Sequence, residues 1–379
     1  MKYLSFLFVL TSWLLISCGA INPPNKRDAP KTNLPLGKLT LPEGFEISIY
    51  AEGVVNARSL CLSPSGTLFV GTRGQGDVYA LQDKDGDGYA ETKFVLATKL
   101  KMPNGVAFRN GSLYVAEVNR ILRYDDIEAN LAAPPEPVVV FDEYPSETHH
   151  GWKYIAFGPD DKLYVPVGAP CNICERDEPI FSTITRIDPD GKNFEIVQKG
   201  IRNSVGFNWH PETKELWFTD NGRDWLGDDS PACELNHASK DGLHFGFPYC
   251  HQGDLPDEKF GEERDCSEFV PPVQKLGPHV APLGLEFVQS KQFPKKYRGQ
   301  ILLAEHGSWN RSTKIGYQIS LVTLDGDQAT SYEPFIKGWL ELGAEDEVWG
   351  RPVDLEWMPD GSLLISDDFA DAIYRVTYP

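Results

Sequence analysis

Short runs of alternating apolar and polar residues recur along most of this chain, and each run follows a turn signal. In the first of them, Pro64-Ser65-Gly66 precedes the strand-like segment TLFVGT (67–72), and a second such segment, DVYAL (77–81), comes after it. Apolar residues at every second position are typical of half-buried strands, and Asp-Gly or Asn-Gly pairs between such runs are typical of hairpins. Beyond the N-terminal leader, no ten-residue stretch shows a helical period. The pattern therefore predicts an all-β protein.

Six copies of this pattern follow one another. Their turn signals begin at Pro64, Asn110, Pro159, Pro211, Tyr297 and Pro359. Paired short strands that recur at intervals of about 45–85 residues are typical of β-propellers. We therefore predict a six-bladed β-propeller over residues 37–379, with long functional loop insertions at 223–290 and 328–350, where the copies are most widely spaced. Loops at one end of a propeller converge on its channel, so the reactive side chains are expected to meet there.

The composition agrees with a folded, turn-rich protein. Glycine and proline make up about 17% of the 379 residues, against about 12% on average, which argues against a helix bundle or a coiled coil. Nine Trp, 15 Tyr and 20 Phe argue against disorder. The net charge of −19 would repel phosphate backbones, so we expect no nucleic-acid partner.

The first 18 residues resemble a bacterial lipoprotein signal. One lysine precedes an apolar run that is too short to span a bilayer, and Leu15-Ile16-Ser17-Cys18 resembles the lipobox, in which the cysteine is acylated. We expect an exported protein anchored by lipid at Cys18, on the periplasmic face or the cell surface, and Gly19 favours the outer membrane. The alternative is an ordinary signal peptide that contains a cysteine. Residues 19–36 are expected to form a flexible tether.

Removal of Cys18 as an anchor leaves an even number of cysteines, which in an exported protein favours disulfides. These cysteines are Cys61, Cys171, Cys174, Cys233, Cys250 and Cys266. The spacing of Cys171 and Cys174 also suits zinc or redox chemistry, but no second such pair exists, so a structural bridge within a loop is expected. The remaining pairings cannot be chosen from the sequence.

Two adjacent histidines, His149 and His150, come just before the third copy of the pattern. Histidine is the natural general base at neutral pH. Neighbouring residues of a strand point to opposite faces, so only one of the two is expected to face the channel. The alternative is a pair of surface or supporting histidines without a role in catalysis.

Two further segments carry groups suited to an anionic or carbonyl ligand and to a hard cation. Arg202-Asn203 supplies a guanidinium fork and an amide, and the alternative is a salt bridge at the edge of a blade. The strand that ends in Asn221-Gly222-Arg223 can expose backbone carbonyls, which are ligands for calcium.

An acidic loop has the spacing of the first half of an EF-hand. Asp83, Asp85 and Asp87 occupy positions 1, 3 and 5, and a glycine follows at position 6. Position 12 is Phe94 rather than glutamate, so Glu91 is the residue left to complete a calcium site. The alternative is a solvated acidic turn.

Seven stretches together resemble the bacterial pyrroloquinoline quinone (PQQ)-dependent sugar dehydrogenases, in particular the sorbosone dehydrogenase-like branch beside the soluble glucose and aldose sugar dehydrogenases. The stretches are HHGWKYIAFGPDDKLYVPVGAPCNIC, GIRNSVGFNWHP, FTDNGRD with ACELN, HFGFPYC, HVAPLGLEF, AEHGSWNRS and GRPVDLEWMPDGSLLISDD. Their order and spacing cover roughly residues 40–379. The family fold is a six-bladed propeller, which agrees with the repeat count.

The resemblance implies a role for each matching residue. The catalytic base falls on His150, eight residues before Gly158, with His149 beside it at the cofactor. Arg202 and Asn203 match a pair beside the quinone carbonyls, and Arg202 would stabilise the charge that develops there. The remaining matches are the carbonyls of Gly222 and Arg223 for the PQQ-bound calcium, Glu234 and Phe245 for a structural calcium, Arg351 and, loosely, Asn104 for PQQ, and Arg311 in place of the family's PQQ-binding lysine.

The same resemblance implies PQQ- and calcium-dependent oxidation of an aldose or a related sugar or aldehyde to the lactone or acid. The His base takes a proton while hydride moves to the quinone, and a soluble or membrane acceptor, a cytochrome or a quinone, receives the electrons. Two other functions stay open. One is a calcium-dependent propeller lactonase or esterase, and the other is a non-catalytic binding propeller on the cell surface.

Overall fold

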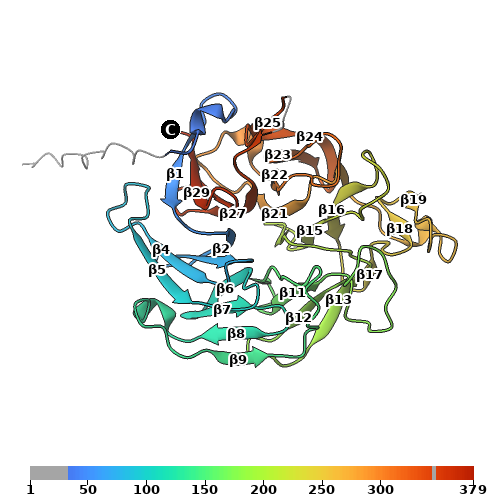
Figure 1. Ribbon diagram of the computed structural model, residues 1–379, viewed down its shortest axis with the longest axis horizontal. Coiled ribbons are helices and arrows are strands. Elements are labelled where there is room, and N and C mark those ends of the chain that lie inside the picture. Colours follow the sequence, from blue (N-terminus) through green and yellow to red (C-terminus); the bar gives the residue numbers. More distant parts are fainter. Residues whose placement is uncertain (1–32, 344–346) are drawn as a thin grey trace, which may run out of the picture.

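Six antiparallel sheets surround one axis in the computed structural model, which describes residues 33–343 and 347–379 (Figure 1). The predicted all-β, six-bladed propeller is confirmed. The only helical segments among the described residues are four three-residue 3₁₀ turns. They are η1 (Leu36–Lys38), η2 (Ile127–Ala129), η3 (Cys266–Glu268) and η4 (Lys295–Tyr297). The predicted leader, with Cys18, and most of the predicted tether lie outside the described residues.

Each of the first three blades is one predicted copy with a further strand on either side. Blade 1 consists of β2 (Ala57–Leu62), β3 (Leu68–Thr72), β4 (Val78–Gln82) and β5 (Thr92–Ala97). Blade 2 consists of β6 (Gly105–Arg109), β7 (Ser112–Ala116), β8 (Ile121–Tyr124) and β9 (Val138–Phe141). Blade 3 consists of β10 (Ala156–Phe157), β11 (Leu163–Val167), β12 (Thr183–Ile187) and β13 (Glu195–Lys199), to which β17 (Leu243–His244) adds in parallel.

The other three blades complete the ring. Blade 4 consists of β14 (Phe207–Trp209), β15 (Leu216–Asp220), β16 (Ala232–Ala238) and β20 (Gln274–Pro278). Blade 5 consists of β21 (Pro282–Phe287), β22 (Ile301–Glu305), β23 (Gln318–Asp325) and β24 (Gln328–Lys337). Blade 6 consists of β27 (Pro352–Trp357), β28 (Leu363–Asp367), β29 (Ala372–Thr377) and β1 (Glu46–Glu52).

The ring is closed by the two ends of the chain. Strand β1 pairs with β29 in antiparallel register from Glu46–Thr377 to Glu52–Ala372. In Figure 1 the first strand therefore lies beside the last. This pairing satisfies the backbone groups of the last blade and leaves the first and last blades as neighbours.

The predicted insertions are shorter than expected. The range 223–290 contains β16, β20 and β21, so the inserted segment is residues 239–273, which holds β17, the strand added to blade 3, together with β18 (Cys250–His251), β19 (Leu255–Pro256) and η3. The range 328–350 begins with β24, the outer strand of blade 5, and among its described residues only β25 (Leu340–Glu341) and β26 (Glu347–Val348) follow. The repeat pattern revealed the inner strands of these blades but missed their less regular outer strands.

The core lies between adjacent blades. Val70 of β3, for example, shares one buried cluster with Leu364 of β28 and Ile373 of β29, so blades 1 and 6 are held face to face. Each such side chain stabilises the fold by about 1.5–3 kcal/mol when fully buried. Tight packing of the faces fixes the innermost strands around the axis, and the residues at their first positions converge at one end of the channel.

Among residues 33–343 and 347–379 there is no helix with the length and apolar character needed to cross a membrane.

Candidate functional site

A cavity of about 550 Å³ lies at one end of the propeller axis, and strands of blades 1, 4 and 5 line it together with loops that connect strands and blades around the ring. We call it the hub cavity. Its lining residues are Arg58, Arg73, Met102, Thr148, His149, His150, Trp152, Arg202, Asn203, Asn221, Gly222, Asp224, Cys233, His279, Ala281, Leu283, His306, Trp309 and Arg351. Many of them stand at the beginning of an innermost strand or just after the second strand of a blade. In antiparallel blades these two positions lie at the same end of the sheet, which explains the convergence.

Four arginines line the hub cavity, and two of them, Arg202 and Arg351, were predicted to meet there. Arg58 belongs to β2, and Arg73 directly follows β3 with its guanidinium 3.7 Å from the centre of the Trp152 ring. Burial and then the charge of Arg58 lower the pKa of Arg73 to about 10. Burial also lowers the pKa of Arg202 and of Arg351. The four arginines are thus incompletely neutralised by the carboxylates of the protein, and the cavity carries net positive charge.

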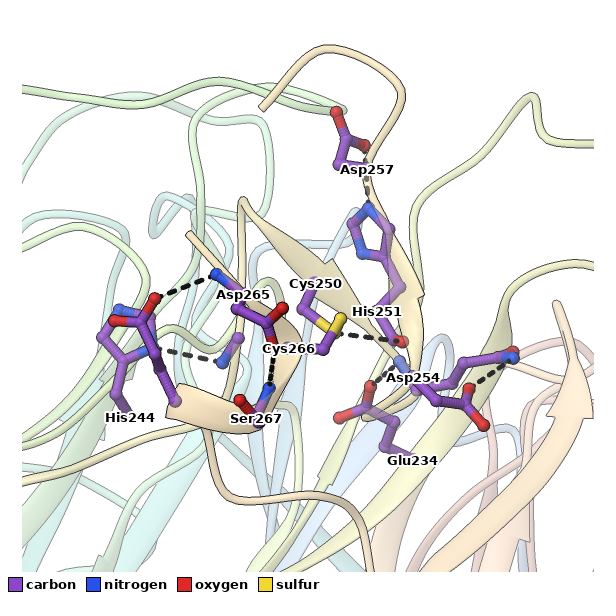
Figure 2. The surroundings of a disulfide bond; sticks show 12 residues. Glu234, His244, Cys250, His251, Asp254, Asp257, Asp265, Cys266 and Ser267 are labelled. Atoms are coloured by element: carbon purple, nitrogen blue, oxygen red, sulfur yellow. Dashed lines mark hydrogen bonds and ion pairs between the residues drawn. A yellow bond between two sulfur atoms is a disulfide. The ribbon is translucent and has the colours of Figure 1, made fainter. Parts of the chain in front are cut away.

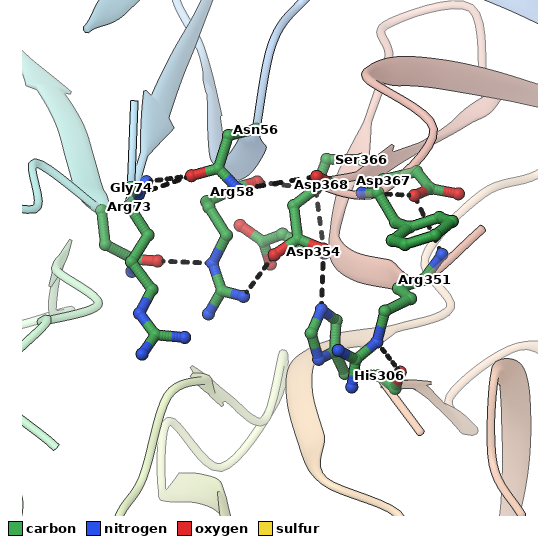
Figure 3. A network of polar contacts seen from close by, with 12 residues as sticks. Asn56, Arg58, Arg73, Gly74, His306, Arg351, Asp354, Ser366, Asp367 and Asp368 are labelled. Carbon is green, nitrogen blue, oxygen red and sulfur yellow. Dashed lines mark hydrogen bonds and ion pairs between the residues drawn. The ribbon is translucent and has the colours of Figure 1, made fainter. Parts of the chain in front are cut away.

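A network of polar contacts joins blades 5, 6 and 1 at the wall of the cavity (Figure 3). Asp368 lies 2.9 Å from Arg58 Nη1 and accepts a 2.7 Å hydrogen bond from His306 Nε2. Arg351 donates to the carbonyls of His306 and Gly307 at 2.9 and 3.0 Å. Burial lowers the pKa of His306 to about 4, so this imidazole is neutral at pH 7.

The two histidines both line the hub cavity, so the prediction that only one faces it is wrong. They lie in a turn rather than a strand, and His150 has a left-handed backbone (φ 50°), so the alternation of strand side chains does not apply. Their ring centres are 4.1 Å apart. His150 is buried and His149 is exposed.

His150 is held in one tautomer by a backbone carbonyl. Its Nδ1 lies 2.8 Å from the oxygen of Ala169, which can only accept, so Nδ1 carries the proton and Nε2 keeps its lone pair. Burial, followed by the charge of Arg202, holds the pKa of His150 well below its ordinary value of 6.5. Gly168 permits this position, because a Cβ there would lie 2.7 Å from the Cβ of His150.

The Arg202-Asn203 segment is fixed by a buried carboxylate. Asp220, the last residue of β15, accepts the backbone N–H groups of Arg202 and Asn203 at 2.8 and 2.6 Å. Burial raises the pKa of Asp220 to about 6. Asn221 then ties this turn to blade 5, because its side chain donates to the carbonyls of Asn203 and Pro282. Asn203 and Gly222 both line the cavity, as expected from the sequence.

Two residues assigned to the cofactor do not line the hub cavity. Asn104 is buried, accepts from Arg58 Nε, and donates to Ser59 and to the carbonyl of Lys153, so it supports Arg58 instead. Arg311 donates to the carbonyls of Asp228 and Thr313 and pairs with Asp229. Through these contacts it holds the loop of Trp309 against the loop after β15.

Of the two predicted structural calcium residues, Glu234 lies beside the insertion (Figure 2) and Phe245 lies within it. Glu234 of β16 accepts from the backbone N–H of Gln252 at 2.7 Å and from Asn236 Nδ2 at 2.9 Å. Burial, and then the charge of Asp220, raise the pKa of Glu234 to about 8. Asn236 Oδ1 is buried without a hydrogen-bond partner among the described residues. Phe245 packs its ring against Phe218, with ring centres 4.8 Å apart.

Arg223, by contrast, turns its side chain away from the hub cavity. Its Nη1 lies 2.5 Å from Asp257, a buried carboxylate that also accepts from His251 at 2.8 Å. Of the two residues expected to hold the PQQ-bound calcium, Gly222 therefore lines the hub cavity and Arg223 does not.

The acidic loop between β4 and β5 gathers three carboxylates, those of Asp83, Asp85 and Glu91, with oxygens within 4.8 Å of one another. Asp87 is not part of this group, because its carboxylate caps the N–H of Tyr89 at 2.9 Å. Asp83 accepts from the N–H groups of Gly86 and Gly88. The three grouped carboxylates therefore resemble a cation site. Two of them, Asp83 and Asp85, were predicted as ligands, and the third is Glu91 rather than Asp87.

Two disulfides form among the described residues, so disulfides are present as the even number of cysteines suggested. Cys171–Cys174 closes a short loop, as predicted, and Cys250–Cys266 staples the insertion of blade 4 (Figure 2). Cys61 and Cys233 are free. They lie on different blades, β2 and β16, and Cys233 lines the hub cavity.

Several cavity residues were not assigned from the sequence. They are Arg58, Arg73, Asp224, His279, His306 and Trp309. Asp224, His279, His306 and Trp309 belong to stretches that carried the family resemblance. Arg58 is the second residue of β2, the innermost strand of blade 1, and Arg351 directly precedes β27, the innermost strand of blade 6, so the two arginines occupy similar places in their blades.

The TrAA12-like family profile matches residues 39–379. The chain belongs to the TrAA12-like family. A protein of Borreliella burgdorferi described as uncharacterized is 32% identical to this TrAA12-like chain over 358 residues, which are 90% of the chain and 91% of that protein. The PQQ-dependent pyranose dehydrogenase of Coprinopsis cinerea is 22% identical over 92% of the chain, which spans 56% of that protein's length.

Solved structures share the fold of this TrAA12-like chain. A Trichoderma reesei protein of carbohydrate-active enzyme family AA12 superposes with a TM-score of 0.77 at 21% identity, covering 90% of the chain and 98% of the other. The PQQ domain of the Coprinopsis cinerea pyranose dehydrogenase superposes with a TM-score of 0.76 at 17% identity, covering 89% and 97%. The resemblance to PQQ-dependent sugar dehydrogenases is confirmed, and the named members of this group are oxidoreductases.

Proposed function

We propose that this chain is a PQQ-dependent dehydrogenase that oxidises an aldose or a related sugar or aldehyde to the lactone or acid. The observation that carries the proposal is the hub cavity itself, where four arginines surround a histidine whose Nε2 is free to accept a proton. The names of the sugar dehydrogenase relatives support the same reaction class.

The residues of the hub cavity fit a planar polyanion such as PQQ, which carries three carboxylates. The four arginines offer charge-assisted hydrogen bonds. The indole Nε1 of Trp152 is buried and has no partner among the described residues, so a donor is available in the wall. Asp224 is the single carboxylate among the described lining residues, and it already pairs with Arg202 at 3.2 Å. A volume of about 550 Å³ lies within the usual range for cofactor sites.

The chain's own contribution to the chemistry is proton removal and charge stabilisation. When bound, PQQ together with a calcium ion as Lewis acid supplies the acceptor for the hydride of the sugar. His150 would take the proton of the sugar hydroxyl at Nε2, since Nδ1 is committed to Ala169. Arg202 would stabilise the negative charge that develops opposite this base. Asn203, Arg351 and His149 would orient the cofactor.

Calcium would be held by the backbone carbonyl of Gly222, which lines the cavity, and by that of Arg223, the next residue along the chain. A second, structural ion at Glu234 would be completed by the unpartnered Oδ1 of Asn236, with the carbonyl of Phe245 proposed from the family resemblance. An ion there would compensate the buried carboxylate of Glu234. The Asp83–Asp85–Glu91 loop is a third candidate.

Two exposed tryptophans, one of which lines the cavity, support a sugar substrate, and the N-terminal sequence supports a lipid anchor. Trp309 lines the hub cavity, is 64% exposed, and meets the 67% exposed Trp225 edge to face, which suits stacking on a sugar ring. Electrons would pass to a cytochrome or a quinone. The Cys18 lipobox supports an exported lipoprotein on the periplasmic face or cell surface, with the outer membrane favoured.

The other two functions predict different behaviour. A calcium-dependent lactonase needs side-chain carboxylates around its ion, whereas arginines dominate the described part of this cavity wall. A binding propeller would show no turnover and would tolerate loss of His150.

The decisive experiment is titration of the purified protein with PQQ in the presence of calcium, followed by aldose-dependent reduction of a dye. Arg202→Ala should weaken PQQ binding, while Arg298→Ala, at an exposed site outside the cavity, should not.

His150→Gln should keep PQQ binding and lose about 10²–10⁴ in rate, the usual effect of removing a general base. Loss of turnover in His149→Gln with a nearly normal His150→Gln would move the base to His149. Absence of PQQ binding by the unaltered protein would reject the proposal.

A further inference from the structure

The loop between β11 and β12 places one asparagine between two bonded cysteines at the wall of the hub cavity. Cys171 and Cys174 form a disulfide that encloses Asn172 and Ile173. Neither cysteine lines the cavity, and Asn172 is half-buried behind the lining residues. The proposed chemistry has so far given this loop no role.

Asn172 binds the guanidinium of Arg202 at two points. Arg202 Nε donates to the backbone carbonyl of Asn172 at 2.9 Å, and Nη2 donates to its side-chain Oδ1 at 2.9 Å. The same Oδ1 accepts the backbone N–H of Asp224 at 2.8 Å, and Nδ2 donates to the Asp224 carbonyl at 3.0 Å. Asn172 of blade 3 thereby fixes two lining residues that come from blade 4.

A count of donors shows what remains of Arg202 for a ligand. A guanidinium has five N–H groups. Besides the two bonds to Asn172, Nη2 donates to Asp224 Oδ2 at 3.2 Å and Nη1 donates to the carbonyl of Asn221 at 3.0 Å. One N–H, on Nη1, has no partner among the described residues, and Arg202 lines the cavity. Asn172 accepts two of the four hydrogen bonds that orient the guanidinium of Arg202. A shift of Asn172 would therefore change the direction of the remaining N–H.

The disulfide restricts the segment that carries these acceptors. Residues 168–182 contain no strand or helix, so few backbone bonds hold the loop in place. A bridge between residues three apart removes much of the freedom that an open loop of this kind has. Both acceptors on Asn172 then stay at the distance that Arg202 needs.

We propose that Asn172, constrained by the Cys171–Cys174 disulfide, is a positioning residue that aims the free Nη1–H of Arg202 at the cofactor. This inference rests on the proposed function, since it concerns how Arg202 meets PQQ. Breaking the bridge is then expected to weaken the cofactor site while the propeller stays folded. The site would work at full strength only in an oxidising compartment.

The test compares PQQ affinity, sugar kinetics and thermal unfolding in matched variants. Asn172→Ala removes the side-chain acceptor, and we expect PQQ binding weaker by about tenfold or more, the usual effect of losing a hydrogen bond to a charged group. The kcat should fall while the KM for sugar stays near normal. Asn172→Asp keeps an oxygen for Arg202 and should bind PQQ within about threefold of the unaltered protein, as rescue by the conservative variant.

The disulfide itself is tested with serine pairs. Cys171→Ser/Cys174→Ser should weaken PQQ binding in the same way, whereas Cys250→Ser/Cys266→Ser, whose bridge lies outside the cavity, should lower only the unfolding temperature. Unchanged PQQ affinity in Asn172→Ala would overturn the inference, and so would equal losses in the two serine pairs. If a variant fails to fold, PQQ affinity in Asn172→Asp and Asn172→Ala decides, because these keep both disulfides. Failure of the unaltered protein to bind PQQ would reject the proposed function instead.

Discussion

The carboxylate of Asp368, in blade 6, contacts one residue of blade 1 and one of blade 5, so we expect its charge to contribute strongly to the stability of the fold. It follows β28 of blade 6 and contacts Arg58 of blade 1 at 2.9 Å and His306 of blade 5 at 2.7 Å (Figure 3). The side chains of Asp368, Arg58 and His306 are 10%, 2% and 12% exposed. Asp368→Asn removes the charge with little change of volume.

The magnitude follows from what the substitution leaves behind. Arg58 keeps its bond to Asn104 but loses its counter-ion in a buried position. Removing one partner of a buried ion pair lowers the free energy of unfolding by about 3–5 kcal/mol. The asparagine oxygen can still accept a hydrogen bond, so we expect a loss of about 3 kcal/mol, the lower end of this range. His306 is neutral at pH 7 and contributes a hydrogen bond rather than a charge.

The assay is urea unfolding followed by tryptophan fluorescence, with Glu178→Gln as the control. Glu178 forms a 2.8 Å ion pair with Arg176, but both side chains are exposed, so this variant should unfold close to the unaltered midpoint. A loss in Asp368→Asn no larger than that of the control would refute the reasoning.

The pH dependence has a defined sign. Burial alone would raise the pKa of Asp368, but His306 and Arg58 outweigh it and hold this pKa well below its usual range. The stabilising effect should therefore be complete above the unfolded value of about 3.9 and shrink only as the pH falls further. The difference between the two proteins should be the same at pH 7 and pH 5.

Three further predictions concern the catalytic base, the structural cation and the anchor. Because burial holds the pKa of His150 well below 6.5, kcat should stay constant as the pH falls through 6.5 and decline only in more acid buffer; a decline centred above 6.5 would contradict this assignment. Removal of calcium with a chelator should lower the unfolding temperature of the unaltered protein but not that of Glu234→Gln, and equal sensitivity would argue against an ion at this carboxylate. Cys18→Ala should release the protein from the membrane fraction, and a variant that still fractionates as a lipoprotein would exclude the anchor.

Local patterns were sufficient to predict the architecture. Strand alternation and turn residues act over only a few neighbours, so six copies of one hairpin pattern predicted six blades without any knowledge of contacts. The pattern is weaker in β16 and β20, and the sequence analysis therefore placed these two strands of blade 4 in a predicted insertion. The family resemblance supplied His150 and Arg202, because each sits in a short stretch with its own signature.

Only the tertiary structure decided which side chains line the cavity and which partners they bind. The strand rule excluded one of the two histidines, yet a left-handed turn at His150 brings both to the cavity. Arg58 and Asp368, which are 310 positions apart, meet because β1 closes the ring and makes the first and last blades neighbours. Asn104 and Arg311 have the right chemistry for a cofactor contact but donate elsewhere, and Cys61 and Cys233 stay free on separate blades. The amino-acid sequence by itself determined which elements form, since their signals are local, whereas the partner of each buried polar group depends on which blades the closed ring sets side by side.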